Sequence, residues 1–237
     1  MKYKITKNTV QETLVIPLYG RKMCSERYPA LYRDETAIRL IDQIDYDFAA
    51  LEKKSGGLMQ RFGVLEAAMR QTDLAFEMRE YLKTHPNAAV VNLGCGLDDT
   101  AWFSRIDTSG GAVFFAAGVF YYFLKEQVRA LVQQMAEAFP GGVLVFDAAN
   151  EKAVRLMLKT WIKDAAIQDV GAYFAVADAR RELSAWDSRL HVSSRGYMLG
   201  YNDLKDPSVS GFFRFLSRIG DNRMNMQIVK IGFGDRR

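Results

Sequence analysis

From residue 86 onward, short apolar runs alternate with amphipathic segments, and this alternation excludes most folds. The runs AAVVNLG (88–94), GAVFFAAG (111–118) and VLVFDA (143–148) are bounded by turn residues and resemble buried strands. The segments 125–139 and 150–165 carry apolar residues at helical spacing, and Asn150 is the predicted N-cap of the second. Strands alternating with helices predict a doubly wound α/β sheet.

The first 85 residues have a different character. DETAIRLIDQI (34–44) and VLEAAMRQTDLAFEMREYL (64–82) place apolar side chains at helical spacing. We therefore predict a helical N-terminal cap over residues 1–85, followed by one structural unit over residues 86–237. The end of that unit is predicted to contain a late strand, a helix and a last strand.

Composition narrows the function classes. The net charge is +4, but the Lys and Arg residues are scattered and lack interleaved aromatic residues, which argues against nucleic-acid binding. Two cysteines and two distant histidines disfavour a disulfide framework, a metal site and a catalytic triad. No membrane partner is predicted, because the longest apolar run is shorter than the roughly 20 residues of a spanning helix. A cytoplasmic location is expected.

The turn after the first strand, GCGLDD (94–99), is the best candidate for a ligand site. Glycines at the carboxyl end of a parallel strand let a ligand approach the backbone closely. A dinucleotide fingerprint would need a third glycine where Asp99 stands, and two carboxylates would repel a pyrophosphate. They would attract an ammonium group. S-adenosylmethionine carries an ammonium group and no phosphate, and is the predicted cofactor; a nicotinamide-dependent oxidoreductase is a disfavoured alternative.

At this point the motifs resemble a known family. VVNLGCGLDDT (90–100) is similar to the first motif of the leucine carboxyl methyltransferase family, which includes the polyketide-synthesis O-methyltransferases. Four further segments resemble this family over nearly the whole chain: SERYPALYRDETA (25–37) with Asp34 as its acid, AAMRQTDLAFEMREYL (67–82), FFAAGVFYYF (114–123) and RGYMLGY (195–201). The resemblance implies a Rossmann-like class I methyltransferase sheet that binds S-adenosylmethionine.

The resemblance also implies which residues hold the cofactor. Arg70 would pair with its carboxylate, and Asp98 would lie near its ammonium group. The turn around the methionine portion and the end of the fourth-strand motif supply the other positions: Gly94, Cys95, Gly96, Ala117 and Gly118. Lys22 stands where the family has a basic cofactor contact, with a surface charge as the alternative. No catalytic residue is identified.

Two departures from the family concern the adenosine half of the cofactor. Only residues 95–111 separate the first strand from the fourth-strand motif, too few for the second and third strands with their helices. We expect a sheet reduced to strands 1-4-5-7-6, with strand one at its edge, unless the link between Asp98 and Thr100 hides an omitted segment. Ala117 also replaces the glutamate common in the family. The acids nearest the turn, Asp99 and Asp107, are interpreted as surface residues.

The predicted function is S-adenosylmethionine-dependent O-methyl transfer to a carboxylate or hydroxyl of a small molecule or a protein terminus. The alternative is a non-catalytic, internally truncated methyltransferase remnant that binds a partner or forms a homodimer through the edge strand. Asp147 is a candidate ligand or helix-cap residue. Four tyrosines are candidates for either acceptor-pocket walls or core: Tyr121, Tyr122, Tyr197 and Tyr201.

Overall fold

The computed structural model describes residues 2–7, 9–54, 57–95, 106–163, 171–202, 204 and 206–234. In these ranges the main sheet has five strands in the order β3-β4-β5-β7-β6. β3, β4 and β5 are parallel, whereas β7 runs antiparallel to both β5 and β6. The strands are β3 (Ala89–Asn92), β4 (Ala112–Ala116), β5 (Val143–Ala148), β6 (Leu190–Gly196) and β7 (Gln227–Phe233).

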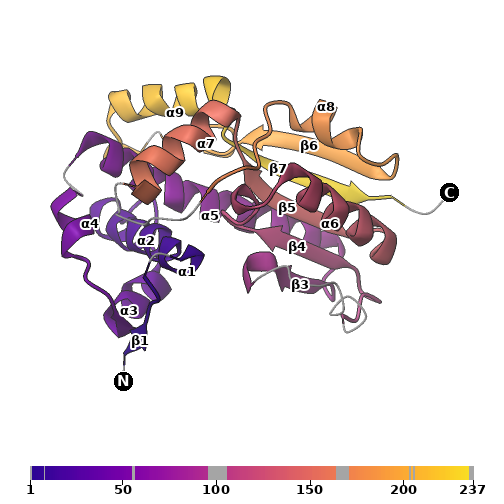
Figure 1. The fold of residues 1–237 in the computed structure, drawn as a ribbon, viewed down its shortest axis with the longest axis horizontal. Coiled ribbons are helices and arrows are strands. Elements are labelled where there is room, and N and C mark those ends of the chain that lie inside the picture. The colour runs from indigo at the N-terminus through magenta and orange to yellow at the C-terminus, as the bar shows by residue number, and fades with distance from the viewer. Residues whose placement is uncertain are drawn as a thin grey trace.

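Helices precede the sheet in sequence and then cover it (Figure 1). The first group is α1 (Val10–Thr13), α2 (Val15–Arg27), α3 (Glu35–Gln43), α4 (Ala49–Lys54) and α5 (Leu58–Thr84), with a two-stranded pair of β1 (Tyr3–Lys4) and β2 (Ile44–Asp45). The second group is α6 (Lys125–Ala138), α7 (Glu151–Met157), α8 (Ala179–Ser184) and α9 (Gly211–Arg223), with short turns η1 (Leu93–Cys95), η3 (Phe120–Tyr122) and the π-helical η4 (Leu158–Lys163).

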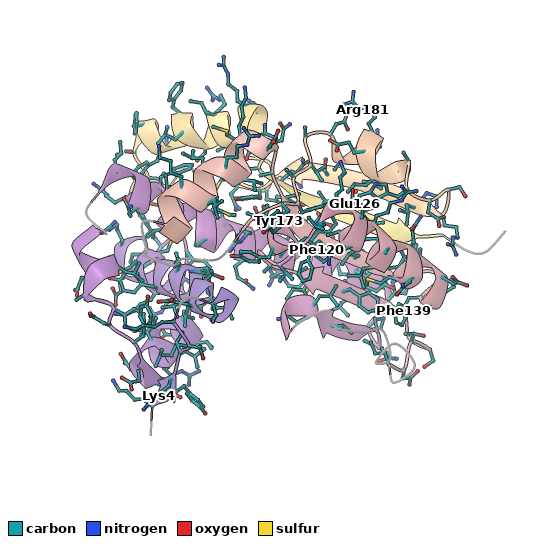
Figure 2. All side chains as sticks on the ribbon, viewed as in Figure 1. Lys4, Phe120, Glu126, Phe139, Tyr173 and Arg181 are labelled. Atoms are coloured by element: carbon teal, nitrogen blue, oxygen red, sulfur yellow. The ribbon has the colours of Figure 1, made fainter. Side chains whose placement is uncertain are left out.

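One face of the sheet is covered by α6 and α8. Alternate residues of the strands point to this face because the side-chain period of a strand is two; they include Phe114 of β4 and Phe146 of β5, both fully buried. The rings of Phe120 and Phe146 lie 4.9 Å apart in an edge-to-face arrangement. Figure 2 shows Phe120 and Phe139 among the side chains packed inside the domain, whereas Arg181 of α8 points outward.

The opposite face is covered by α5, with α7 and α9 beside it. Val113 and Val145 point to this side and pack with Leu65 and Met69 of α5. Because α5 packs both on α2 and on strands β4, β5 and β7, it joins the N-terminal helices to the sheet. The division of the chain at residue 85 into a cap and a domain stays a prediction.

The edge strand β3 departs from the expectation of a doubly covered strand. Val91 packs on the core beneath α6, but Val90 is 49% exposed and Asn92 is exposed. Among the described residues β3 pairs only with β4, so the sheet that they form has the expected order with strand one at its edge. The described residues between β3 and β4 form no strand, and the link from Asp98 to Thr100 lies outside the described residues.

A local signal in the sequence predicted the start of α7 correctly. The Asn150 side chain accepts a hydrogen bond from the Ala153 amide, which confirms the predicted N-cap of α7. Asp34, matched to the family's early acid, caps α3 by accepting from the Ala37 amide. Within the described ranges, no helix combines the length and the apolar character needed to cross a membrane.

Candidate cofactor and acceptor site

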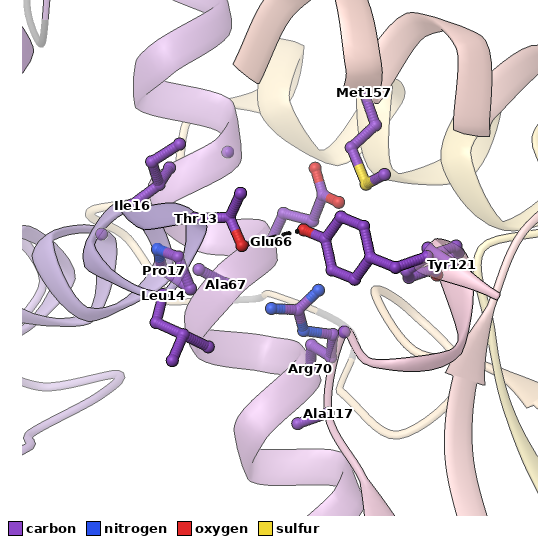
Figure 3. A pocket seen from close by; sticks show the side chains of 14 residues that line it. Thr13, Leu14, Ile16, Pro17, Glu66, Ala67, Arg70, Ala117, Tyr121 and Met157 are labelled. Atoms are coloured by element: carbon purple, nitrogen blue, oxygen red, sulfur yellow. Dashed lines mark hydrogen bonds between the residues drawn. The ribbon is translucent and has the colours of Figure 1, made fainter. Parts of the chain in front are cut away.

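A cavity opens at the carboxyl end of β4, where open α/β sheets bind their ligands. Its volume is about 720 Å³ including the part open to solvent. One wall comes from α1 and α2, and the other from α5 and the segment after β4. Figure 3 shows the guanidinium of Arg70 and the carboxylate of Glu66 pointing into this space.

Helix α5 supplies the charged side chains of the cavity. Glu66 and Arg70 are one helical turn apart, so they lie on the same face of α5, with Gly63 and Ala67 beside them. The small residues leave room for the chain of α2, where a Cβ on Gly20 would lie 3.3 Å from the Cβ of Ala67. Helix α5 therefore presents the Glu66 carboxylate and the Arg70 guanidinium to the cavity that it forms with α1 and α2.

Asp147, at the end of β5, holds Arg70 in place. Its Oδ2 lies 3.2 Å from Nη1 of Arg70, and its Oδ1 accepts a 2.6 Å hydrogen bond from the Gly118 amide. The side chain of Asp147 is 1% exposed and that of Arg70 is 16% exposed. Burial alone would lower the pKa of Arg70, but the adjacent Asp147 carboxylate outweighs it and raises this pKa. The Arg70 guanidinium is therefore charged and oriented.

Glu66 has a different environment from Asp147. The Tyr197 hydroxyl donates to Glu66 Oε1 at 3.0 Å, and no described residue donates to Oε2. Burial raises the pKa of Glu66 above its ordinary value, and the nearby Arg70 charge opposes this increase. Burial also raises the pKa values of Tyr121 and Tyr197, so both phenols stay protonated near neutral pH.

Gly118 permits the close approach between the end of β4 and Arg70. Its φ is +66°, and an added Cβ would lie 3.3 Å from Arg70 Nη1. Gly118→Ala is expected to lower the free energy of unfolding by about 1–2 kcal/mol, because a side chain is strained in this backbone region. Urea unfolding measures the loss. In the control Gly211→Ala, at the start of α9 with nothing within 4 Å of the added Cβ, no loss is expected.

The structure brings together only some of the residues predicted from the sequence. Arg70, Ala117 and Gly118 line the cavity, whereas Gly94 lies in the turn after β3 and is exposed. Lys22 lies on α2, pairs with Glu26 at 3.4 Å and does not line the cavity.

The rest of the predicted glycine turn lies at the end of a described range or beyond it. Cys95 ends η1, while Gly96 and Asp98 lie outside the described residues. Their assignment as cofactor contacts stays a prediction.

Sequence reasoning missed Glu66 and left Asp147 undecided. The signal for Glu66 was its spacing of four residues before Arg70, which places both on one helix face. Asp147 caps no helix in the described structure and instead joins β5 to Arg70 and Gly118. Asp107 is a surface residue as interpreted, and it accepts from the Ser109 amide.

The tyrosines divide between the two interpretations. Tyr121 and Tyr122 line the cavity, and the Tyr122 hydroxyl donates to Thr13 Oγ1 at 3.1 Å. Tyr121 and Tyr197 are also core residues, 4% and 2% exposed. Tyr201 does not line the cavity, and its hydroxyl donates to Glu77 at 2.7 Å. Tyr121 is therefore both a wall of the cavity and a core residue.

A parallel three-stranded unit followed by an antiparallel pair, with a cavity at the carboxyl end of its second strand, defines a Rossmann-like α/β fold. No family model matches the chain. The tetracenomycin polyketide synthesis O-methyltransferase TcmP from Streptomyces glaucescens is 30% identical over 93 residues, 39% of this chain. That match covers 32% of the relative, so the chain spans about a third of its length. It supports the resemblance to the polyketide-synthesis O-methyltransferases.

Two solved structures are similar to the chain at low identity. A DUF574 family protein from Streptomyces avermitilis has a TM-score of 0.50 at 7% identity, covering 92% of this chain and 97% of that protein. This similarity is evidence about the fold and carries no information about activity. A methyltransferase candidate from Thermobifida fusca has a TM-score of 0.45 at 12% identity, covering 91% and 94%.

Proposed function

We propose that the chain is an S-adenosylmethionine-dependent O-methyltransferase. The observation that carries this proposal is that Arg70, Ala117 and Gly118, matched to cofactor contacts by motif alone, line one cavity at the carboxyl end of β4. The curated relative, itself an O-methyltransferase, supports the same chemistry. When bound, the cofactor would supply an electrophilic methyl group on a sulfonium.

The described residues fit the amino-acid half of this cofactor. Arg70 offers a charged guanidinium to a carboxylate, and Gly118 has no side chain to block its approach. Gly94, Cys95, Gly96 and Asp98 are proposed to complete this half from the turn after β3. Lys22 is a proposed further contact, although its amine is paired with Glu26. No acidic residue was predicted for the ribose, so we expect weak affinity.

Calorimetry with S-adenosylmethionine, S-adenosylhomocysteine and NAD tests the proposal. We expect weak binding of the first two and none of NAD. Arg70→Ala is expected to weaken binding by about ten- to a hundredfold, because a charge-assisted hydrogen bond contributes about 1.5–3 kcal/mol.

Two further variants guard against a loss of structure. Arg70→Lys keeps a positive charge beside Asp147 but loses the planar guanidinium, and is expected to bind with intermediate affinity. Arg79→Ala removes an exposed arginine of the same helix and should leave binding unchanged. Tight NAD binding, or an Arg70→Ala variant that is folded and binds as well as its parent, would contradict the proposal.

The alternative is a non-catalytic remnant, and the exposed edge strand β3 favours it. Val90 is 49% exposed on a strand that has one partner among the described residues. Absence of S-adenosylmethionine binding together with a concentration-dependent homodimer would support this alternative. A cytoplasmic location, and the absence of nucleic-acid, membrane and metal partners, stay predictions.

A further inference from the structure

A second cavity lies on the other side of Glu66 and Arg70, between α5, α7 and α9. Its volume is about 820 Å³ including the part open to solvent. Its wall is mostly apolar and includes Phe62, Val154, Leu216, Ile219, Met224 and Met226. Flexible methionine side chains adapt to the shape of an apolar ligand. A pocket of this kind suits a largely hydrocarbon molecule rather than a charged one.

The two cavities share one boundary. Glu66, Arg70, Tyr121 and Met157 line both of them. The two cavities are therefore adjacent, and a molecule in either of them would contact these four side chains. Under the proposed function, on which this inference rests, the first cavity takes the methyl donor and the second takes the acceptor.

Among these boundary groups, only Glu66 can accept a proton from an acceptor. Asp147 has Oδ1 bonded to the Gly118 amide and Oδ2 paired with Arg70, and its side chain is 1% exposed. Arg70 is charged and has no acceptor atom. Tyr121 keeps its proton because burial raises its pKa. Glu66 Oε2 has no donor among the described residues, so it is the open acceptor at the boundary.

The charges at the boundary also select the acceptor class. Glu66 and Asp147 bring two carboxylates to this region, while Arg70 brings one guanidinium, which the proposed function assigns to the cofactor carboxylate. A carboxylate acceptor would be repelled by Glu66 and would need no base. A neutral hydroxyl would donate a hydrogen bond to Glu66 and would need a base to become a good nucleophile.

We propose that the second cavity binds an apolar phenol and that Glu66 is the general base that receives its hydroxyl proton. The acceptor oxygen forms its bond to the methyl carbon of the bound sulfonium while the carbon–sulfur bond breaks with its electron pair left on sulfur, and the hydroxyl proton passes to Glu66. Tyr197 orients Glu66 by donating to Oε1, which leaves Oε2 without a donor among the described residues. Burial raises the pKa of Glu66, which makes its carboxylate a stronger base than a solvent-exposed one.

Binding of 2-naphthol and 2-naphthoate to the full chain without cofactor tests this proposal. The two probes have the same ring system, but 2-naphthol carries a hydroxyl where 2-naphthoate carries a carboxylate. We expect 2-naphthol to bind at least about tenfold more tightly, since one good hydrogen bond and one avoided repulsion are worth a tenfold ratio or more. Glu66→Gln is expected to weaken 2-naphthol about tenfold and to reduce the preference over 2-naphthoate.

The pH dependence provides a second measurement. Affinity for 2-naphthol should rise as Glu66 ionises and stay high until the phenol itself ionises. The titratable and charged groups that face Glu66 are Arg70 of its own helix, Asp147 of β5, Tyr121 of η3 and Tyr197 after β6. In Glu66→Gln the rise at low pH should disappear.

Controls separate this inference from the proposed function. Glu80→Gln changes an acid of α5 that pairs with Lys83, outside both cavities, and should leave both affinities unchanged. Ala153→Leu narrows the second cavity and should reduce 2-naphthol binding without changing S-adenosylmethionine binding. This test does not depend on whether the Glu66→Gln variant folds. Failure to bind 2-naphthol, equal binding of both probes, or an unchanged affinity in a folded Glu66→Gln variant overturns the inference. If S-adenosylmethionine still binds, the proposed function survives that failure.

Discussion

Replacement of Asp147 by alanine is expected to lower the free energy of unfolding by about 3–5 kcal/mol, because it leaves a buried guanidinium without its counter-charge. Arg70 is 16% exposed and its Nη1 pairs with Asp147 Oδ2 at 3.2 Å. The same change removes the acceptor of the Gly118 amide, which bonds to Oδ1 at 2.6 Å. Urea unfolding at neutral pH measures the loss.

The matched control for Asp147 is an acid paired with an arginine at the surface. Glu151 and Arg155 form such a pair on α7, with side chains 71% and 76% exposed. Glu151→Ala should change stability by less than about 1 kcal/mol, as expected for exposed ion pairs. Asp147→Asn, which keeps an acceptor for the Gly118 amide, should lose less than Asp147→Ala. A loss below about 1 kcal/mol in Asp147→Ala would show that Arg70 finds another partner.

Asp73→Asn is expected to stabilise the protein at alkaline pH by about 2–4 kcal/mol. Asp73 is 1% exposed, and burial raises its pKa to about 8, although the Asn202 amide donates to Oδ1 at 3.0 Å. Its Oδ2 is buried without a hydrogen-bond partner among the described residues. Ionisation of Asp73 above pH 8 therefore lowers the free energy of unfolding.

The sign of the pH effect follows from the raised pKa of Asp73. Between the unfolded value near 4 and the folded value of about 8, the folded chain binds the proton more strongly than the unfolded chain. The free energy of unfolding should therefore fall as pH rises through this window and level off above it. Asp73→Asn should remove this fall, with little change at pH 4. Asp42→Asn, at an exposed position, serves as the control, and an equal pH dependence in Asp73→Asn and wild type would contradict the assignment.

The sequence predicted the central elements of the sheet, and together with the family resemblance it predicted the order of the strands. Apolar period and turn residues predicted β4, α6, β5 and α7, and Asn150 marked the start of α7 because an asparagine cap acts over three residues. The short interval from 95 to 111, read with the family resemblance, predicted that strand one lies at an edge next to β4, and the described residues agree with this. The apolar period, the helix cap and the length of one connection are local features, so residue spacing is enough to detect them.

The tertiary structure decided which charges meet. Arg70 and Asp147 are 77 positions apart in sequence, and Tyr197 reaches Glu66 across 131 positions. No spacing rule joins them: α5 must pack on the carboxyl ends of β4 and β5 before Gly118, Asp147 and Arg70 come into contact. The open face of Val90 also depends on which helices cover the sheet, so a continuous apolar run could not reveal it. Contacts between distant segments follow from how layers pack, and local propensity carries no information about that packing.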